Sequence, residues 1–212
     1  MNIIDLPKKI AVFPLSNAVF FPKTVLPLNI FEERYIQLVS DCMQDKRLFG
    51  MVQPKTKEKN YLNVYEVGCL GKITSFNETN DKRFIINLSG IIRFRIIEEL
   101  KTSKLYREFK VDYTDFSEDL KIIKNDDLQY DKASLLKKIK TYFKKKDYII
   151  NVNELEKLNF DQLINTLCMI SPLTVEEKQK LIETNSTKEK IKVFENIINF
   201  NLVDNFENTT IQ

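Results

Sequence analysis

The stretch KIAVFPLSNAVFFPKTVLPLNIFEERY, residues 9–35, combines closely spaced apolar residues with three prolines and carries little charge before Glu32. Apolar residues at this density are typical of a buried core. Prolines at this spacing are incompatible with one long helix and with one uninterrupted strand. The stretch therefore predicts short extended segments joined by irregular turns.

Short strand-like segments dominate the chain as far as about residue 115. One helix interrupts them, because apolar residues between Phe31 and Met43 recur at the spacing of a single buried helix face. In IIRFRII, residues 91–97, alternation places Ile92, Phe94 and Ile96 on one face and the arginines on the other. The predicted strands lie within residues 9–15, 48–54, 71–76, 82–90, 91–99 and 108–116.

From about residue 126 the apolar period changes to that of helices. Thr174 and Ser186 each stand three residues before a glutamate, which is the pattern of a capping box. Asn159 marks a similar helix start. The last predicted helix, residues 187–203, is apolar on nearly all sides, which favours a central place among the helices. Two buried stripes are predicted: Leu135, Leu136, Ile139, Tyr142 and Phe143, and Phe160, Leu163, Ile164, Leu167 and Cys168.

The composition argues against several kinds of enzyme. The chain has no histidine, so Ser-His and Cys-His pairs and imidazole zinc ligands are absent. The segment EVGCLGKIT, residues 66–74, comes nearest to a phosphate-binding loop, but Glu66 replaces the first glycine and Ile73 replaces the hydroxyl residue. We therefore expect no enzymatic activity, no cofactor and no metal ion.

Charge and cysteine content point to a cytoplasmic protein. The net charge of +3 is mild for a dedicated nucleic-acid binder. The three cysteines are far apart and odd in number, as is typical of free thiols in a reducing compartment. No segment has the length and apolar character of a secretory signal or a membrane span, so we expect no association with membranes.

The segment KKIKTYFKKK, residues 137–146, allows two interpretations. It resembles a basic patch with interleaved aromatic residues, as found in nucleic-acid sites. Alternatively its apolar residues belong to a buried helix face and the lysines cover the solvated faces, which we favour.

The opening stretch resembles the N-terminal substrate-binding domain of the ATP-dependent Lon proteases. The segments GIIRFRI, residues 90–96, and ISPLTVEEKQKLIE, residues 170–183, are similar to later parts of that domain, so the resemblance covers about residues 9–204. The matching elements of the stretch follow the family's order: Phe13-Pro14-Leu15, Phe21-Pro22, Leu26-Pro27-Leu28, Ile30-Phe31-Glu32 and Arg34-Tyr35.

The resemblance implies an α+β fold. An N-terminal PUA-like β-barrel with one inserted helix would occupy residues 1–118, and a C-terminal α-helical bundle would occupy residues 119–212. Lon proteases continue into an ATPase domain and a Ser-Lys peptidase domain, whereas this sequence ends at Gln212 without either. We therefore expect a stand-alone relative of the Lon N-terminal domain.

The resemblance also suggests which apolar residues of the opening stretch are core. We expect this of Phe13, Leu15, Leu28 and Phe31. A second group follows the turn-like Ser16-Asn17 and has two possible locations: it either forms an exposed apolar surface that docks extended polypeptide or belongs to the core. The candidate binding residues are Val19, Phe20, Phe21 and Leu26.

The expected function is that of a non-enzymatic module that binds exposed apolar or unfolded polypeptide, or a partner protein. The alternative is an RNA-binding domain, because PUA-like barrels also occur in RNA-binding proteins. The sequence leaves the identity of the partner and the oligomeric state open.

Overall fold

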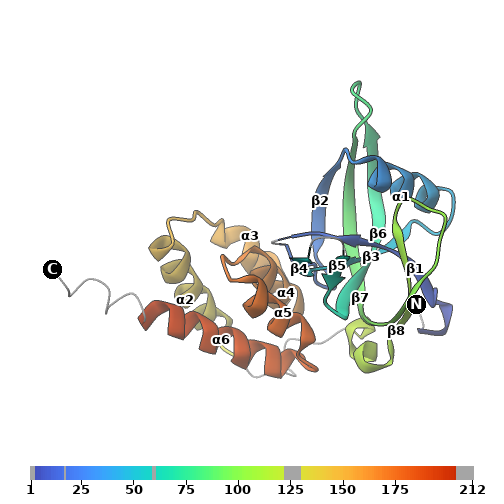
Figure 1. Ribbon diagram of the computed structural model, residues 1–212. Helices are drawn as coiled ribbons and strands as arrows, with labels where there is room; N and C mark the ends of the chain where they lie inside the picture. Colours follow the sequence, from blue (N-terminus) through green and yellow to red (C-terminus); the bar gives the residue numbers. More distant parts are fainter. Residues whose placement is uncertain (1–2, 17, 59–60, 122–129, 204–212) are drawn as a thin grey trace. The chain divides into compact units, whose positions relative to one another are not determined.

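The structure is a computed structural model that describes residues 3–16, 18–58, 61–121 and 130–203 (Figure 1). The chain forms two compact units, Met1–Lys121 and Ile122–Gln212. Among the described residues, the first unit is a sheet with one α-helix and the second is helical, so the chain is α+β as expected. The division falls three residues after the expected boundary at residue 118.

The larger sheet has the strand order β2-β7-β6-β3-β1-β8, and β8 also pairs with β7. Five strands therefore form a closed ring of pairings, while β2 pairs with β7 outside that ring. Strands β1 and β3 are parallel, and the other neighbours are antiparallel. The strands are β1 (Lys9–Pro14), β2 (Val25–Ile30), β3 (Leu48–Val52), β6 (Val67–Glu78), β7 (Phe84–Leu100) and β8 (Arg107–Asp112). A separate hairpin joins β4 (Pro54–Glu58) and β5 (Tyr61–Val64).

Strand β7 is one continuous strand of 17 residues, although the sequence predicted two strands in this region. Its first part pairs with β2, its middle with β6 and its end with β8. The ladder with β6 shifts register opposite Gly90, so the strand bends and continues. Figure 1 shows the paired ends of β6 and β7 extending beyond the other strands.

The helix α1 (Glu33–Met43) packs its apolar face against the sheet unit's core. Tyr35, Leu38, Val39 and Cys42 are buried on this face, as the spacing predicted. The Tyr35 ring centroid lies 4.0 Å from that of Phe13 on β1, which ties the helix to the sheet. A short 3-10 helix, η1 (Ile3–Asp5), precedes β1.

An ion pair inside the sheet unit fastens the segment after β8 to β7. The 3-10 helix η2 (Thr114–Leu120) follows β8 and places Asp119 beside Arg93 of β7. The Arg93 Nε and Nη2 atoms donate to the two carboxylate oxygens at 2.8 Å, and the Arg93 backbone N–H donates to the same group. The guanidinium also lies 4.5 Å from the centre of the Phe116 ring. Arg93 is thus on the face opposite the apolar residues, as predicted, but it is buried under η2.

The helical unit buries both predicted apolar stripes completely. The predicted caps are present: the Thr174 and Glu177 pair forms a full capping box, and the Asn159 side chain accepts from the Gln162 N–H. Helix α6 contacts α2, α4 and α5, in agreement with its predicted central place. The helices are α2 (Lys132–Lys145), α3 (Val152–Lys157), α4 (Phe160–Ile170), α5 (Val175–Glu183) and α6 (Thr187–Val203).

Two lysines lie inside the helical unit, which the sequence did not predict. The Lys190 ammonium donates to the Asn165 side-chain oxygen at 2.8 Å, and the Lys178 ammonium donates to the Met169 carbonyl oxygen at 3.1 Å. Burial lowers the pKa of Lys178, because it disfavours the charged form. These hydrogen bonds offset part of the cost of removing the ammonium groups from water.

The attachment of η2 to β7 by the buried Arg93–Asp119 pair can be tested by substitution. We expect Asp119→Ala to lower the free energy of unfolding by about 3–5 kcal/mol, because it leaves the buried guanidinium without this carboxylate. Asp115→Ala is the matched control on the same 3-10 helix, since Asp115 pairs with Arg95 at an exposed site. The control is expected to cost less than about 1 kcal/mol. Equal losses in urea titrations of the two variants would contradict this account.

Candidate functional site

The outward face of β2 carries exposed apolar side chains next to the predicted binding residues. Side chains alternate between the two faces of a strand. In β2, Leu28 and Ile30 are buried, whereas Val25, Pro27 and Asn29 are exposed. Large aliphatic residues at every even position from 26 to 30 are the sequence signal for this arrangement. The opening stretch predicted only short extended segments, which did not distinguish the two faces of β2.

Two more apolar residues extend this face. Ile85 on β7 lies opposite Asn29 in the strand register and is 46% exposed. Phe31 follows β2 directly, continues the outward alternation and is 63% exposed. Residues diagonal to a cross-strand pair are within reach of long side chains, which places Pro27 near Ile85. We call Val25, Pro27, Phe31 and Ile85 the β2–β7 face.

The predicted surface at Val19, Phe20 and Phe21 is wrong, because all three side chains are buried. The ring of Phe20 lies against Gly71, where the missing side chain leaves room for it. The carbonyl oxygen of Phe21 accepts a hydrogen bond of 2.7 Å from the Thr24 hydroxyl. These residues therefore belong to the core, which was the other location that the sequence allowed.

The burial of the other apolar residues of the opening stretch agrees only in part with the prediction. Phe13 and Leu28 are core residues, as predicted, while Leu15 and the candidate binding residue Leu26 are half-buried. Phe31 was expected in the core and is exposed, because it precedes α1 and falls on the outward side of the alternation. The accessible apolar surface thus lies on the odd-numbered residues of β2.

The open edge of β2 has limited capacity to pair with another strand. Among the described strands, β2 pairs only with β7. Pro27 in the middle of β2 has no N–H to donate, and proline within a strand is characteristic of sheet edges. A guest strand added at this edge would lack one ladder hydrogen bond at residue 27. The side chains of the β2–β7 face are therefore a better contact surface than the strand edge.

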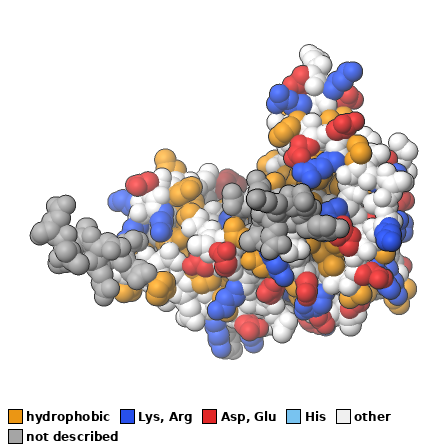
Figure 2. Space-filling model, in the orientation of Figure 1, with side chains coloured by type: hydrophobic (Ala, Val, Ile, Leu, Met, Phe, Trp, Pro, Cys, Tyr) orange, Lys and Arg blue, Asp and Glu red, His pale blue; other side chains and the backbone are white. Residues whose placement is uncertain are grey.

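The surroundings of this face carry charge of both signs. In the view of Figure 2, the projecting ends of β6 and β7 show charged side chains toward the tip and hydrophobic ones nearer the sheet. One exposed ion pair at the tip joins Arg83 and Asp81 at 2.8 Å. Another, Arg34–Glu32 at 2.7 Å, lies directly after Phe31. Such a mixed rim confers no strong preference for a polyanion.

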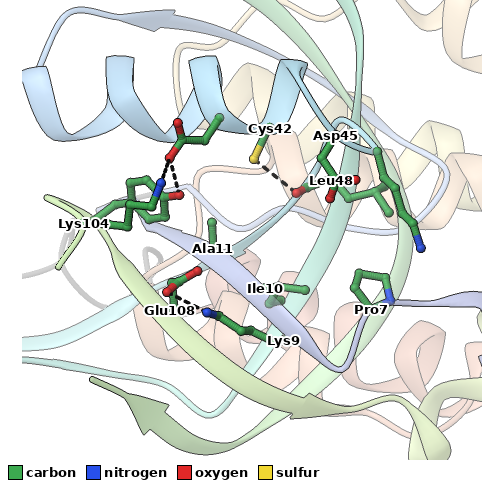
Figure 3. A pocket seen from close by; sticks show the side chains of 12 residues that line it. Pro7, Lys9, Ile10, Ala11, Cys42, Asp45, Leu48, Lys104 and Glu108 are labelled. Carbon is green, nitrogen blue, oxygen red and sulfur yellow. Dashed lines mark hydrogen bonds and ion pairs between the residues drawn. The ribbon is translucent and has the colours of Figure 1, made fainter. Parts of the chain in front are cut away.

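A cavity of about 320 Å³ between α1, β1 and β8 is the second candidate site. Apolar and charged side chains both line it, and Figure 3 shows the Lys9–Glu108 ion pair between neighbouring strands on one side. At the other side, Asp41 of α1 accepts hydrogen bonds from Lys104 Nζ at 2.6 Å and from the Tyr106 hydroxyl at 2.8 Å. These contacts tie α1 to the chain before β8.

The polar groups of this cavity stabilise the fold. The hydrogen bond from Lys104, followed by that from Tyr106, holds the pKa of Asp41 below its usual value. Burial raises the pKa of the Cys42 thiol to about 12, so the thiol is protonated at neutral pH and is a poor nucleophile. Figure 3 shows this thiol directed at the Leu48 carbonyl oxygen, 3.3 Å away. Within the described parts of the chain, no group of three potential ligands is placed to hold a metal ion.

None of the described helices is long and apolar enough to cross a membrane.

Comparison with protein families identifies the chain. The model of the ATP-dependent protease La (LON) substrate-binding domain matches residues 9–199. The chain belongs to this family. The match includes both the sheet unit with the β2–β7 face and nearly all of the described helical unit.

Curated relatives of this LON substrate-binding domain include Lon proteases. The Lon protease of Dictyoglomus thermophilum is 24% identical over 89% of the chain, and that of Anaeromyxobacter dehalogenans is 24% identical over 94%. The chain spans about a quarter of the length of these relatives, 24% of each. The similarity therefore covers only part of each Lon protease.

Solved structures share the fold of this LON substrate-binding domain. A Lon N-terminal domain protein from Xanthomonas campestris matches with a TM-score of 0.61 at 20% identity, covering 87% of this chain and 95% of that one. The N-terminal domain of a Mycobacterium avium complex Lon protease matches with a TM-score of 0.64 at 15% identity, covering 91% and 98%. The sequence-based assignment to the Lon N-terminal domain is thus confirmed.

Phe20 is buried and Phe31 is exposed, so substitutions at these two positions should differ in their effect on stability. We expect Phe20→Ala to lower the free energy of unfolding by about 3–5 kcal/mol, because it opens a cavity in the core. Phe31→Ala should change it by no more than about 0.5 kcal/mol, since the ring is mostly in water. Equilibrium unfolding in urea measures both values. A small change in the free energy of unfolding for Phe20→Ala would show that the Phe20 ring is not part of the core.

Proposed function

We propose that the chain is a non-enzymatic module that holds exposed apolar segments of unfolded polypeptide on the β2–β7 face. The observation that carries the proposal is the match to a substrate-binding domain over residues 9–199. The exposed apolar surface on β2 and β7 supports it, because exposed apolar clusters are characteristic of binding surfaces. A folded partner protein that presents an apolar segment would use the same contacts.

The strength of such binding follows from the size of the face. Burying one aliphatic or aromatic side chain contributes about 1.5–3 kcal/mol. Ordering a flexible guest removes several kcal/mol of this gain. A few anchors, with Phe31 and Ile85 the most prominent, therefore give a dissociation constant of roughly micromolar or weaker. Weak binding without sequence preference suits a module that samples many unfolded chains.

Side-chain contacts carry this binding in our proposal, and pairing at the strand edge contributes little. Pro27 removes a donor from the open edge of β2, so a guest backbone cannot form a continuous ladder there. Val25 and Ile85, in contrast, are available to guest side chains in any register.

We also propose a finer description of the fold of each unit. The closed ring of pairings through β7 and β8 supports a PUA-like barrel in the sheet unit. The contacts of α6 with three other helices support a helical bundle in the second unit. RNA binding, the alternative function, gains no support from the family match, which is to a protein-substrate domain.

Removal of the two largest anchors tests the proposed face. We expect Phe31→Ser/Ile85→Ser to weaken binding of chemically unfolded casein about tenfold or more, because two apolar contacts of this size are lost. The melting temperature should stay the same, since both side chains are exposed. Fluorescence anisotropy of labelled casein measures the affinity.

The matched control replaces two equally exposed apolar residues elsewhere in the sheet unit. Ile97→Ser/Leu105→Ser changes side chains that are 55% and 56% exposed. This variant should bind casein as the unchanged chain does. Equal losses of affinity in both variants would show that casein binds exposed apolar residues without preference for this face. Unchanged affinity in both variants would exclude the β2–β7 face as the binding site.

The non-enzymatic part of the proposal has a separate test. The purified chain is expected neither to hydrolyse ATP nor to cleave casein, because the family match is confined to the substrate-binding domain and the sequence lacks a phosphate-binding loop. A coupled ATPase assay and gel electrophoresis of casein digests measure the two activities. Turnover that co-elutes with the pure chain would refute this part and leave the binding face untouched.

A further inference from the structure

Helix α2 presents a row of lysines that the helical unit does not use. The exposed ammonium groups of Lys137, Lys140 and Lys144 make no hydrogen bond or ion pair within the described parts of the chain. Other lysines of this helix do have partners: Lys138 pairs with Glu195 at 2.8 Å, and Lys132 Nζ donates to backbone carbonyl oxygens at the end of α3. The three unused lysines are spaced as neighbours along one face of the helix.

The end of α2 holds two apolar residues in solvent beside this row. Asp147 has a left-handed φ of 59°, and the Tyr148 N–H donates to the Phe143 carbonyl oxygen at 2.9 Å. These are the marks of a Schellman ending, and the Tyr148 ring makes the accompanying contact with Phe143 at 6.4 Å. The ending fixes the direction of the chain and leaves Ile149 100% exposed. Tyr148 follows directly after this ending and is 56% exposed.

The end of α6 lies next to the end of α2. Lys145 Nζ donates to the Leu202 carbonyl oxygen at 2.5 Å, which joins the last turns of the two helices. Phe200 and Val203, on either side of Leu202, are 64% and 66% exposed. Exposed apolar residues therefore follow α2 and lie in the last turn of α6, at the two helix ends that Lys145 joins.

We propose that this end of the helical unit docks an acidic amphipathic helix of a partner protein. We define the α2 surface as Lys137, Lys140, Lys144, Tyr148 and Ile149. The lysine row spans about 10 Å at 1.5 Å per residue, so acidic residues at the same helical spacing on a partner helix would face it. The apolar face of that helix would cover Ile149 and the neighbouring end of α6. Charge complementarity thus selects an acidic partner, and the apolar residues select an amphipathic one.

The same surface fits a nucleic acid less well. Nucleic-acid surfaces favour arginine and flat aromatic platforms on which bases stack. Helix α2 contains no arginine, and the most exposed apolar side chain of the surface is the aliphatic Ile149. Aliphatic side chains gain more from covering by another apolar surface than from contact with bases.

The test uses the full chain and a defined probe. A synthetic helical peptide of about 18 residues, about 27 Å long, carries leucine on one face and glutamate on the other. A second peptide replaces every glutamate by lysine. By fluorescence anisotropy we expect the acidic peptide to bind at least about tenfold more tightly than the basic one, and this preference to shrink when salt rises from about 50 to about 500 mM.

Two variants separate the charged and apolar parts of the α2 surface. Lys137→Glu/Lys140→Glu/Lys144→Glu and, separately, Ile149→Ser are each expected to weaken binding of the acidic peptide about fivefold or more. Circular dichroism should show both variants folded, since all four side chains are exposed. Lys8→Glu/Lys72→Glu/Lys101→Glu makes the same change in charge at exposed lysines of the sheet unit and should leave binding unchanged.

Three results would overturn the proposal. Undiminished binding by the triple lysine variant would show that the row takes no part. Loss of binding in the control variant as well would show that binding depends on the net charge of the chain and not on the α2 surface. Tighter binding of a mixed-sequence single-stranded RNA, lost in the triple lysine variant, would assign the surface to nucleic acid instead.

Discussion

The sheet unit depends on the close approach of two backbone segments at Gly90. A side chain at this position would overlap the carbonyl group of Phe21, so only glycine allows the chain before β2 to cross β7 there. The crossing is fixed by backbone hydrogen bonds, from the Lys23 N–H to the Gly90 carbonyl oxygen and from the Gly90 N–H to the Thr24 carbonyl oxygen, both at 2.9 Å. From this point β2 runs antiparallel to β7, while β7 continues to β6 and β8. This crossing therefore sets the position of β2 along β7.

The same crossing decides which apolar residues are available to a guest. Phe20 and Phe21 lie before it and are buried, whereas the odd residues of β2 lie after it and face solvent. A few residues thus separate a core that stabilises the unit from a face that is open for contact. This separation agrees with the demands on a substrate-binding domain, because binding residues must be exposed without weakening the fold that holds them.

The two units place their charges in different ways. In the sheet unit, Arg93 is enclosed with Asp119, and the pair fastens η2 to β7. In the helical unit, the buried Lys190 donates to the Asn165 side chain. The exposed Lys137, Lys140 and Lys144 of α2 have no partner among the described residues. Charge that is enclosed with a partner serves the fold, and charge left in solvent is available for association. The α2 surface is the clearest case of the second kind.

The sequence alone determined the change from strands to helices, the helix caps, the buried helix stripes and the resemblance to the Lon N-terminal domain. These features are local, since helical period and capping residues act within a few positions. Tertiary structure alone decided that β7 is one strand, that Arg93 is buried and that Phe31 is exposed. It also decided that the Val19–Phe21 group takes the core location, one of the two that the sequence allowed. Each of these depends on a segment distant in sequence: η2 covers Arg93, and β6 and β7 lie against Phe20 and Phe21. Apolar character shows that a residue tends to be buried, but the partner that buries it is set by the packing of the whole unit.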